Sequence, residues 1–202
     1  MSAAELIEPI DADGRTLAKG SLVRGWLQVL VADQLLDAVV ARSVPEVVSL
    51  LKEPPVSSAW VDVAHLECIA QAVLLEVGEA RILDLTVRSH RVGLVALLSR
   101  WLGGIIRVFG PSPHTVLQHA QAAAKANTVG FSMSWINLGD KHGVLEAHYP
   151  FRSRIHAGGA WATSAACTLA GEAVRVPLQL EPPRITPRKG GGSMVTIAAS
   201  WR

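Results

Sequence analysis

The densest group of polar side chains in the chain lies in the segment EAHYPFRSRIHAGG, residues 146–159. It contains Tyr149, Arg152 and Arg154, a few positions before a pair of glycines. The planar guanidinium group of arginine matches the geometry of carboxylate and phosphate groups, so these residues are candidates for binding an anionic ligand. The alternative is a structural role, in which the arginines are solvated or pair with nearby acids such as Glu146.

Histidine side chains can bind metal ions, and His119 is one of two histidines on a predicted helix. It lies in the segment 110–127, where Ser112 is a plausible N-cap and Asn127 a plausible end of one helix. His114 does not share a helix face with it cleanly, because five residues separate them. An exposed or capping histidine is the alternative. The serines lack a G-x-S-x-G context and an indicated base, so we expect no enzymatic activity.

The period of the apolar residues changes near residue 127, and this change predicts the fold class. After it, apolar residues alternate with small or polar ones, as from Val129 to Trp135, which is typical of half-buried strands. We expect an α+β fold in which a helical N-terminal half packs on a four-stranded antiparallel sheet with one inserted helix, in the order strand-strand-helix-strand-strand. The expected strands are 128–135, 144–149, 173–180 and 193–201, the inserted helix is 157–172, and 183–192 is a loop.

The N-terminal half, up to about residue 127, is apolar and predicted to be helical. After a polar lead-in at 1–18, helices are expected near 22–40, 44–53, 61–78 and 81–109, the last broken near Gly93. Apolar residues from Leu66 to Val73 recur at helical spacing, and Gly78 is a plausible stop. The apolar helix surface between Leu22 and Val108 exceeds what one small sheet covers, so we expect a homodimer through these helices.

Composition restricts the class of protein. With 202 residues, of which 50% are hydrophobic, the chain suits a single domain, here 19–202. A net charge of +2 with interspersed signs argues against nucleic acid as a partner. Cys68 and Cys167 form no CxxC motif, and the acidic N-terminus is no signal peptide, so we expect a cytoplasmic protein. The apolar segment 92–109 contains Arg100 and Arg107, so we expect no membrane span.

Four features resemble a family of unknown function that has many paralogues in myxobacteria. They are KGSLVRG from Lys19, Trp60 after PPVSS, RSHRVG before a long helix, and a closing strand that ends in Trp201. That family's fold is similar to haem-nitric-oxide/oxygen-binding sensor domains, 4-vinyl-reductase-type domains and certain subunits of vesicle-tethering complexes. The resemblance implies a pocket between the two halves. It implies a non-catalytic sensor or interaction module that binds a small ligand or a protein partner in signalling.

The same resemblance raises haem as an alternative. The haem sensors carry a tyrosine-x-serine-x-arginine signature that grips the haem propionates. Tyr149, Ser153 and Arg154 supply the residue types, but the tyrosine lies two residues too far from the serine, and Pro150 interrupts the pattern. A one-residue slip along a strand turns a side chain to the other face of the sheet, and a clamp of three converging groups is sensitive to such changes, so this clamp departs from the family's. In a haem-based gas sensor, the resemblance would make His119 the axial ligand; otherwise no cofactor is expected.

Overall fold

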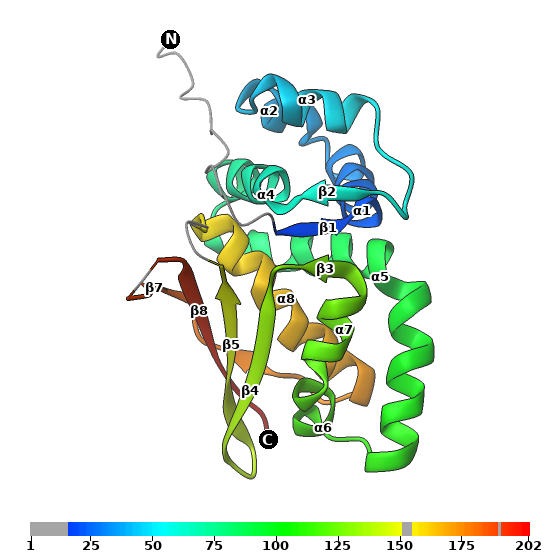
Figure 1. Ribbon diagram of the computed structural model, residues 1–202, viewed down its shortest axis with the longest axis vertical. Coiled ribbons are helices and arrows are strands. Elements are labelled where there is room, and N and C mark those ends of the chain that lie inside the picture. Colours follow the sequence, from blue (N-terminus) through cyan, green and yellow to red (C-terminus); the bar gives the residue numbers. More distant parts are fainter. Residues whose placement is uncertain (1–15, 151–154, 190) are drawn as a thin grey trace.

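The computed structural model describes residues 16–150, 155–189 and 191–202. Figure 1 shows a helical upper half and a lower half that contains the main sheet. The upper half holds α1 (Gly20–Ala32), α2 (Leu36–Ala41), α3 (Pro45–Lys52), α4 (Val63–Val77) and the start of α5 (Glu79–Phe109). The lower half adds α6 (Pro113–Gln118), α7 (Ala120–Asn127) and α8 (Ala157–Val174).

The strands form two sheets, and every pairing described is antiparallel. The small sheet has the order β2-β1-β3, from β1 (Leu17–Lys19), β2 (Trp60–Asp62) and β3 (Thr128–Val129). The main sheet has the order β4-β5-β8-β6, from β4 (Ser132–Gly139), β5 (His142–Tyr149), β6 (Gln179–Leu180) and β8 (Ser193–Ser200), and β7 (Arg184–Pro187) also pairs with β8. The predicted α+β class, with a helix inserted between strands of an antiparallel sheet, is confirmed.

Alternation along the strands matches burial. In β5, Leu145, Ala147 and Tyr149 are buried and the residues between them are half-buried. Val195 and Ile197 are buried in the paired strand β8, opposite Ala147 and Leu145. Since side chains alternate across a strand, one face of the sheet is buried in the core. Both strands thus show the alternation that is typical of half-buried strands.

Several predicted boundaries were wrong. Residues 184–187, expected in a loop, form β7, and the strand expected at 173–180 is reduced to Gln179–Leu180. The prolines at 182, 183 and 187 argued against a strand here, because proline cannot donate to a strand ladder and is confined to edge strands, strand starts and bulges. The helix expected over 112–127 is divided at His119, which has φ −99° and ψ 3°. The short strands β1 and β2 were not expected.

The helix α5 is unbroken at Gly93, and this glycine serves packing instead. A side chain at Gly93 would overlap the carbonyl oxygen of Ser21 in α1, and one at Gly25 of α1 would overlap the carbonyl oxygen of Ser89 in α5. The two glycines therefore allow the backbones of α1 and α5 to lie closer than any other residue would permit.

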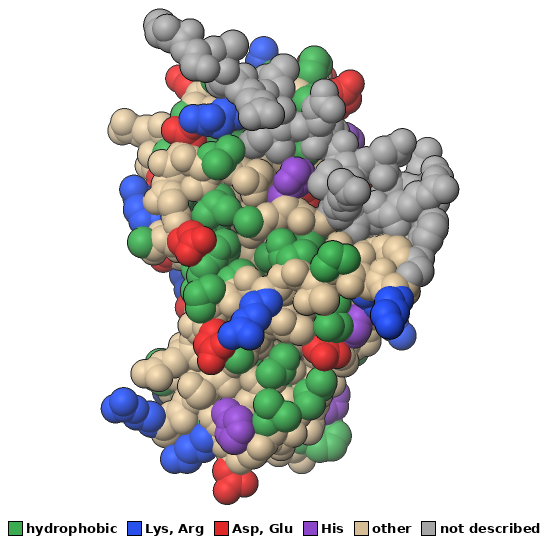
Figure 2. Space-filling model, turned by 90° about the vertical axis from the view of Figure 1, so that its left-hand side faces the viewer, with side chains coloured by type: hydrophobic (Ala, Val, Ile, Leu, Met, Phe, Trp, Pro, Cys, Tyr) green, Lys and Arg blue, Asp and Glu red, His purple; other side chains and the backbone are tan. Residues whose placement is uncertain are grey.

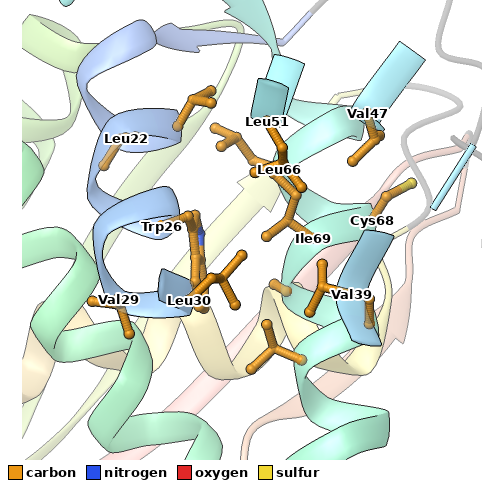
Figure 3. Packing of buried hydrophobic residues seen from close by; sticks show 14 of the residues in the cluster. Leu22, Trp26, Val29, Leu30, Val39, Val47, Leu51, Leu66, Cys68 and Ile69 are labelled. Atoms are coloured by element: carbon orange, nitrogen blue, oxygen red, sulfur yellow. The ribbon is translucent and has the colours of Figure 1, made fainter. Parts of the chain in front are cut away.

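The helical half has its own hydrophobic core (Figure 3). Trp26 and Leu30 of α1 point toward Ile69 of α4, and Val39 and Val47 come from α2 and α3. All five are almost fully buried. Gly78, with φ 73°, ends α4 as predicted. A second core, which includes Leu145 and Ile197, lies between the sheet and α8.

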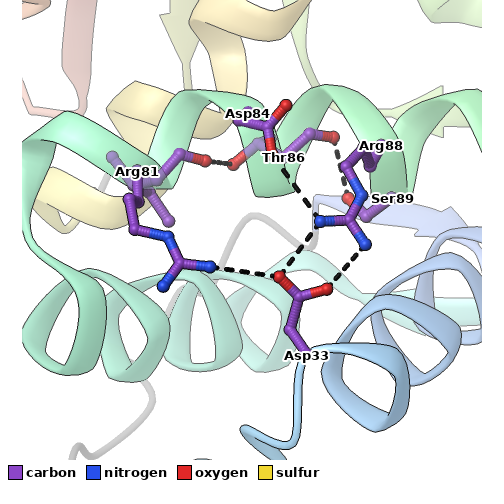
Figure 4. A network of polar contacts seen from close by, with 7 residues as sticks. Asp33, Arg81, Asp84, Thr86, Arg88 and Ser89 are labelled. Atoms are coloured by element: carbon purple, nitrogen blue, oxygen red, sulfur yellow. Dashed lines mark hydrogen bonds and ion pairs between the residues drawn. The ribbon is translucent and has the colours of Figure 1, made fainter.

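A polar network joins the end of α1 to α5 (Figure 4). Arg88 donates two hydrogen bonds to the Asp33 carboxylate, at 3.0 and 2.6 Å, and Arg81 donates a third at 3.3 Å. These hydrogen bonds, the Arg88 bonds above all, lower the pKa of Asp33. The bidentate geometry fixes the orientation of α1 against α5.

The helices α6 and α7 also bind the backbone of the edge strand β4. The side-chain oxygen of Gln121 accepts a hydrogen bond from the N–H of Met133. At the other end of β4, His114 Nε2 donates to the carbonyl oxygen of Gly139 at 2.8 Å, and its Nδ1 accepts from Trp135 at 2.9 Å. These contacts hold α6 and α7 beside the edge strand β4 (Figure 1).

The described surface carries mixed charge. On the face in Figure 2, positive and negative side chains are interspersed and gather in no continuous field of one sign. Cys68 and Cys167 are both free and buried. Among the described residues, no helix has the length and apolarity needed to cross a membrane.

Candidate ligand cavity

A cavity of about 200 Å³ lies where the helical half meets the sheet half. Its walls come from α1 and α4 above, from α5 and α6 beside it, and from β4, β5 and α8 below. Most of the lining is apolar, and it includes Leu22, Trp26, Leu66, Phe131, Met133 and Leu169.

The composition of α8 explains why there is space at this position. Six residues of α8 line the cavity at helical spacing: Gly159, Ala162, Thr163, Ala166, Leu169 and Ala170. Positions three and four apart lie on one face of a helix, so this stripe faces the cavity as a unit. Five of its six members are small, and they leave a volume that larger side chains would fill.

Glu67 is the only acidic residue among the described residues that line the cavity. The residue is only 8% exposed, and its Oε2 accepts a hydrogen bond from the backbone N–H of His156 at 3.2 Å. A side chain at Gly159 would overlap the Glu67 carboxyl group, so glycine at this position leaves room for the carboxyl group where it lies. Burial raises the pKa of Glu67 to about 8, against the smaller lowering by the His156 hydrogen bond.

Tyr149 lies in the cavity wall beside Glu67, in a short chain of hydrogen bonds. Its hydroxyl is 2.9 Å from Thr163 Oγ1, and Thr163 Oγ1 donates to the carbonyl oxygen of Gly159 at 3.0 Å. The one hydroxyl hydrogen of Thr163 is used in that bond, so Tyr149 is the donor to Thr163. Burial is the main cause of the raised pKa of Tyr149, and the nearby Glu67 adds to it.

Two more polar groups face the same space. His90 Nδ1 lies 2.9 Å from the carbonyl oxygen of Thr86, so Nδ1 carries the hydrogen and Nε2 is left as an acceptor. Burial lowers the pKa of His90, which favours the neutral ring. Thr16 is 4% exposed, and its hydroxyl has no hydrogen-bond partner among the residues described.

The residues singled out in the sequence differ in their relation to the cavity. Tyr149 lines the cavity, whereas Arg152 and Arg154 fall outside the described residues and stay predictions. His119 is at the junction of α6 and α7, where its Nδ1 donates to the carbonyl oxygen of Thr115 at 2.8 Å and its ring lies 5.1 Å from that of Phe109. It is not among the residues that line the cavity.

Sequence reasoning missed Glu67 and His90. Glu67 is three positions before Ala70, a member of the predicted buried stripe of α4, and this spacing was a signal that its side chain faces inward. His90 is in the RSHRVG segment noted for its resemblance to a family, but nothing in the sequence indicates which face of α5 meets the cavity.

Solved structures with a similar architecture are H-NOX proteins. A point mutant of an H-NOX protein from K. algicida, in the unliganded Fe(II) state, has a TM-score of 0.61 and 11% sequence identity, and the match covers 91% of this chain and 96% of that one. A mutant H-NOX of T. tengcongensis has a TM-score of 0.58 and 12% identity over 91% and 97% of the chains. The chain has an H-NOX-like fold.

An oxygen-binding H-NOX domain related to soluble guanylate cyclases gives a TM-score of 0.54 at 11% identity, with 91% and 95% of the two chains covered. No protein-family model and no curated protein matches the chain. At this level of identity the likeness concerns the fold, and chemistry must be argued from this chain's own residues.

Haem is the group that the fold implies, and the cavity does not fit it. Pockets for drug-sized ligands measure about 300 to 1,000 Å³, and a tetrapyrrole with its side groups needs a pocket of that kind. The cavity here is about 200 Å³. His119, the histidine expected to bind the iron, is outside the lining. The described residues therefore suit a smaller occupant.

Proposed function

We propose that the protein is a non-catalytic, cytoplasmic sensor or interaction module that binds a small, mainly apolar molecule in the cavity between its two halves. The observation that carries the proposal is the apolar cavity at this junction, with Glu67, His90 and Tyr149 in its wall. A cavity of about 150 Å³ lined by apolar side chains is enough to bind benzene. A volume of about 200 Å³ therefore suits a single-ring molecule with a short substituent.

The position of the cavity supports a sensing role. Its walls include α1 and α4, which belong to the helical core, and β4, β5 and α8, which belong to the sheet core. A molecule held there touches both halves, so it binds best to one arrangement of them. Differential affinity of this kind is what allows a ligand to shift a conformational equilibrium.

Ala166→Leu is expected to abolish binding of a single-ring probe such as toluene. Ala166 lines the cavity from α8, and a leucine at this position would occupy the space that the probe needs. For the unaltered protein, toluene at a hundred times its Kd is expected to raise the Tm by about 5 to 10 °C. Thermal unfolding with and without toluene measures the difference.

The matched control is Ala80→Leu, which makes the same change on an exposed helical residue of α5, away from the cavity. It is expected to leave the toluene-induced shift unchanged. Equal shifts in Ala166→Leu and the unaltered protein would place the binding elsewhere and contradict the proposal, as would no shift in either.

A homodimer through the helical half also stays a prediction. Val31, Leu75 and Val92 are exposed on α1, α4 and α5, which leaves apolar helix surface in contact with water. Light scattering at high micromolar concentration is expected to give twice the chain mass of 21.5 kDa. A mass of one chain under these conditions would contradict the dimer.

A further inference from the structure

Three polar side chains of the cavity wall, Tyr149, Thr163 and His90, use their hydrogens in bonds within the wall. The Tyr149 hydroxyl donates to Thr163, and Thr163 in turn donates to Gly159, so the hydrogens of both groups are used within the wall. The Nδ1 hydrogen of His90 is likewise used on the carbonyl oxygen of Thr86. What these groups still offer are lone pairs, on the Tyr149 oxygen and on His90 Nε2.

Glu67, once ionised, adds the strongest acceptor to this set. Its Oε2 receives one hydrogen bond, from His156 N–H, and no donor among the described residues reaches Oε1. The hydroxyl of Thr16, also buried in the wall, has no described partner either. Buried polar groups without partners are costly, so a ligand that supplies hydrogen-bond donors here is favoured.

Aromatic rings occupy the same wall. Phe131 and Tyr149 both line the cavity, and their rings meet edge to face with centroids 4.9 Å apart. The face of an aromatic ring attracts a cation. No lysine or arginine among the described residues lines the cavity, so no described cation of the lining pairs with Glu67.

This inference deepens the proposed function and rests on it. We propose that the ligand is a small apolar primary amine, whose ammonium group pairs with the Glu67 carboxylate while its hydrocarbon part fills the apolar remainder of the cavity. An ammonium group has three donors and no acceptor, which complements the lone pairs of Tyr149 and His90 Nε2 and the ionised carboxylate of Glu67. It also supplies a positive charge, which no described residue of the lining offers to Glu67.

Formation of this ion pair requires Glu67 to lose its carboxyl proton. Burial keeps Glu67 protonated at neutral pH, so an incoming ammonium ion displaces the carboxyl proton to solvent and leaves the ion pair behind. The other groups around Glu67 keep their charge: Tyr149 and Cys68 have raised pKa values, and the lowered pKa of His90 keeps its ring neutral. His156 contacts Glu67 through its backbone N–H. Binding therefore releases about one proton at pH 7.

Titration calorimetry with benzylamine, benzyl alcohol and toluene tests the assignment, since the three share one ring and differ in the polar group. For the unaltered protein at pH 7, benzylamine is expected to bind at least about tenfold more tightly than benzyl alcohol. Titrations in buffers of different ionisation enthalpy should show about one proton released with the amine and none with the alcohol.

Glu67→Gln is expected to weaken benzylamine binding at least about tenfold and to abolish the proton release, while toluene binding is retained. Retained toluene binding shows that the variant is folded with its cavity intact. The matched control Glu53→Gln, on an exposed residue after α3, is expected to bind all three probes like the unaltered protein.

The outcomes separate the two proposals. If toluene or benzyl alcohol binds as tightly as benzylamine, or if Glu67→Gln leaves amine affinity unchanged, the amine assignment is wrong and the ligand-binding function stands. If none of the three probes binds the unaltered protein, both proposals are overturned.

Discussion

Glu67→Gln is expected to become progressively more stable than the unaltered protein as the pH rises from about 4.5 to 8. Burial raises the pKa of Glu67 from 4.5 to about 8. In that interval the unfolded chain has released its proton and the folded chain still holds it, so rising pH favours unfolding. The loss is about 1.4 kcal/mol for each pH unit, or about 5 kcal/mol over the interval. Glutamine does not titrate and keeps an oxygen that can accept from His156.

Chemical denaturation of both proteins at pH 5, 6, 7 and 8 measures the difference in the free energy of unfolding. His90 and Asp33 also have shifted pKa values, but they are present in both proteins and cancel in the comparison. Glu53→Gln serves as the control, with a profile expected to follow the unaltered protein. A difference that stays constant from pH 5 to 8 would show that Glu67 titrates alike in the folded and unfolded chains.

Gly25→Ala is expected to lower the free energy of unfolding by about 3 kcal/mol or more. The added methyl group would overlap the carbonyl oxygen of Ser89, which is fixed in the backbone of α5 and cannot rotate away. The helices α1 and α5 would have to separate, at the cost of the packing around Trp26 and Val29. In a domain of this size the Tm should fall by about 6 to 12 °C.

Gly103→Ala makes the same substitution within α5, at a position where nothing lies within 4 Å of the added methyl group. Here alanine is expected to be neutral or stabilising by up to about 1 kcal/mol, because glycine is the poorer helix former. Thermal unfolding of the two variants side by side isolates the steric effect. Equal Tm values for Gly25→Ala and the unaltered protein would show that the helices are not in close contact.

The sequence was sufficient for features that depend on local period. The strand alternation in β5 and β8, the position of α8 and the end of α4 at Gly78 all follow from spacing and turn chemistry, which act over a few residues. The class of fold followed, because helical and strand periods occupy separate halves of the chain.

Features that depend on distant pairing could not be predicted. The strands β1 and β2 have three residues each, too few for a period, and they exist because Leu17–Lys19 pairs with Trp60–Asp62. The division of the helix at His119 could not be predicted from a helix-breaking residue, because residues 114–127 contain no glycine or proline. It accompanies the contact of α7 with β4, where Gln121 binds the N–H of Met133.

The candidate site was predicted only in part for the same reason. Tyr149 was singled out in the sequence as a candidate ligand-binding residue, and the alternation of β5 turns its side chain into the core. Glu67 could not be recognised, because an acidic residue on a helix is usually solvated, and only the burial by α8 and the overlap with Gly159 give it a special character.

The contacts of α6 and α7 with β4 have a consequence for self-association. An edge strand exposes backbone N–H and C=O groups that can template a strand from another molecule, which is a route to aggregation. Near one end of β4, the N–H of Met133 donates a hydrogen bond to Gln121. At the other end, the carbonyl oxygen of Gly139 accepts a hydrogen bond from His114. At the opposite edge, β7 ends in Pro187, which has no N–H to donate. Addition of a foreign strand to this sheet is thereby opposed at both edges.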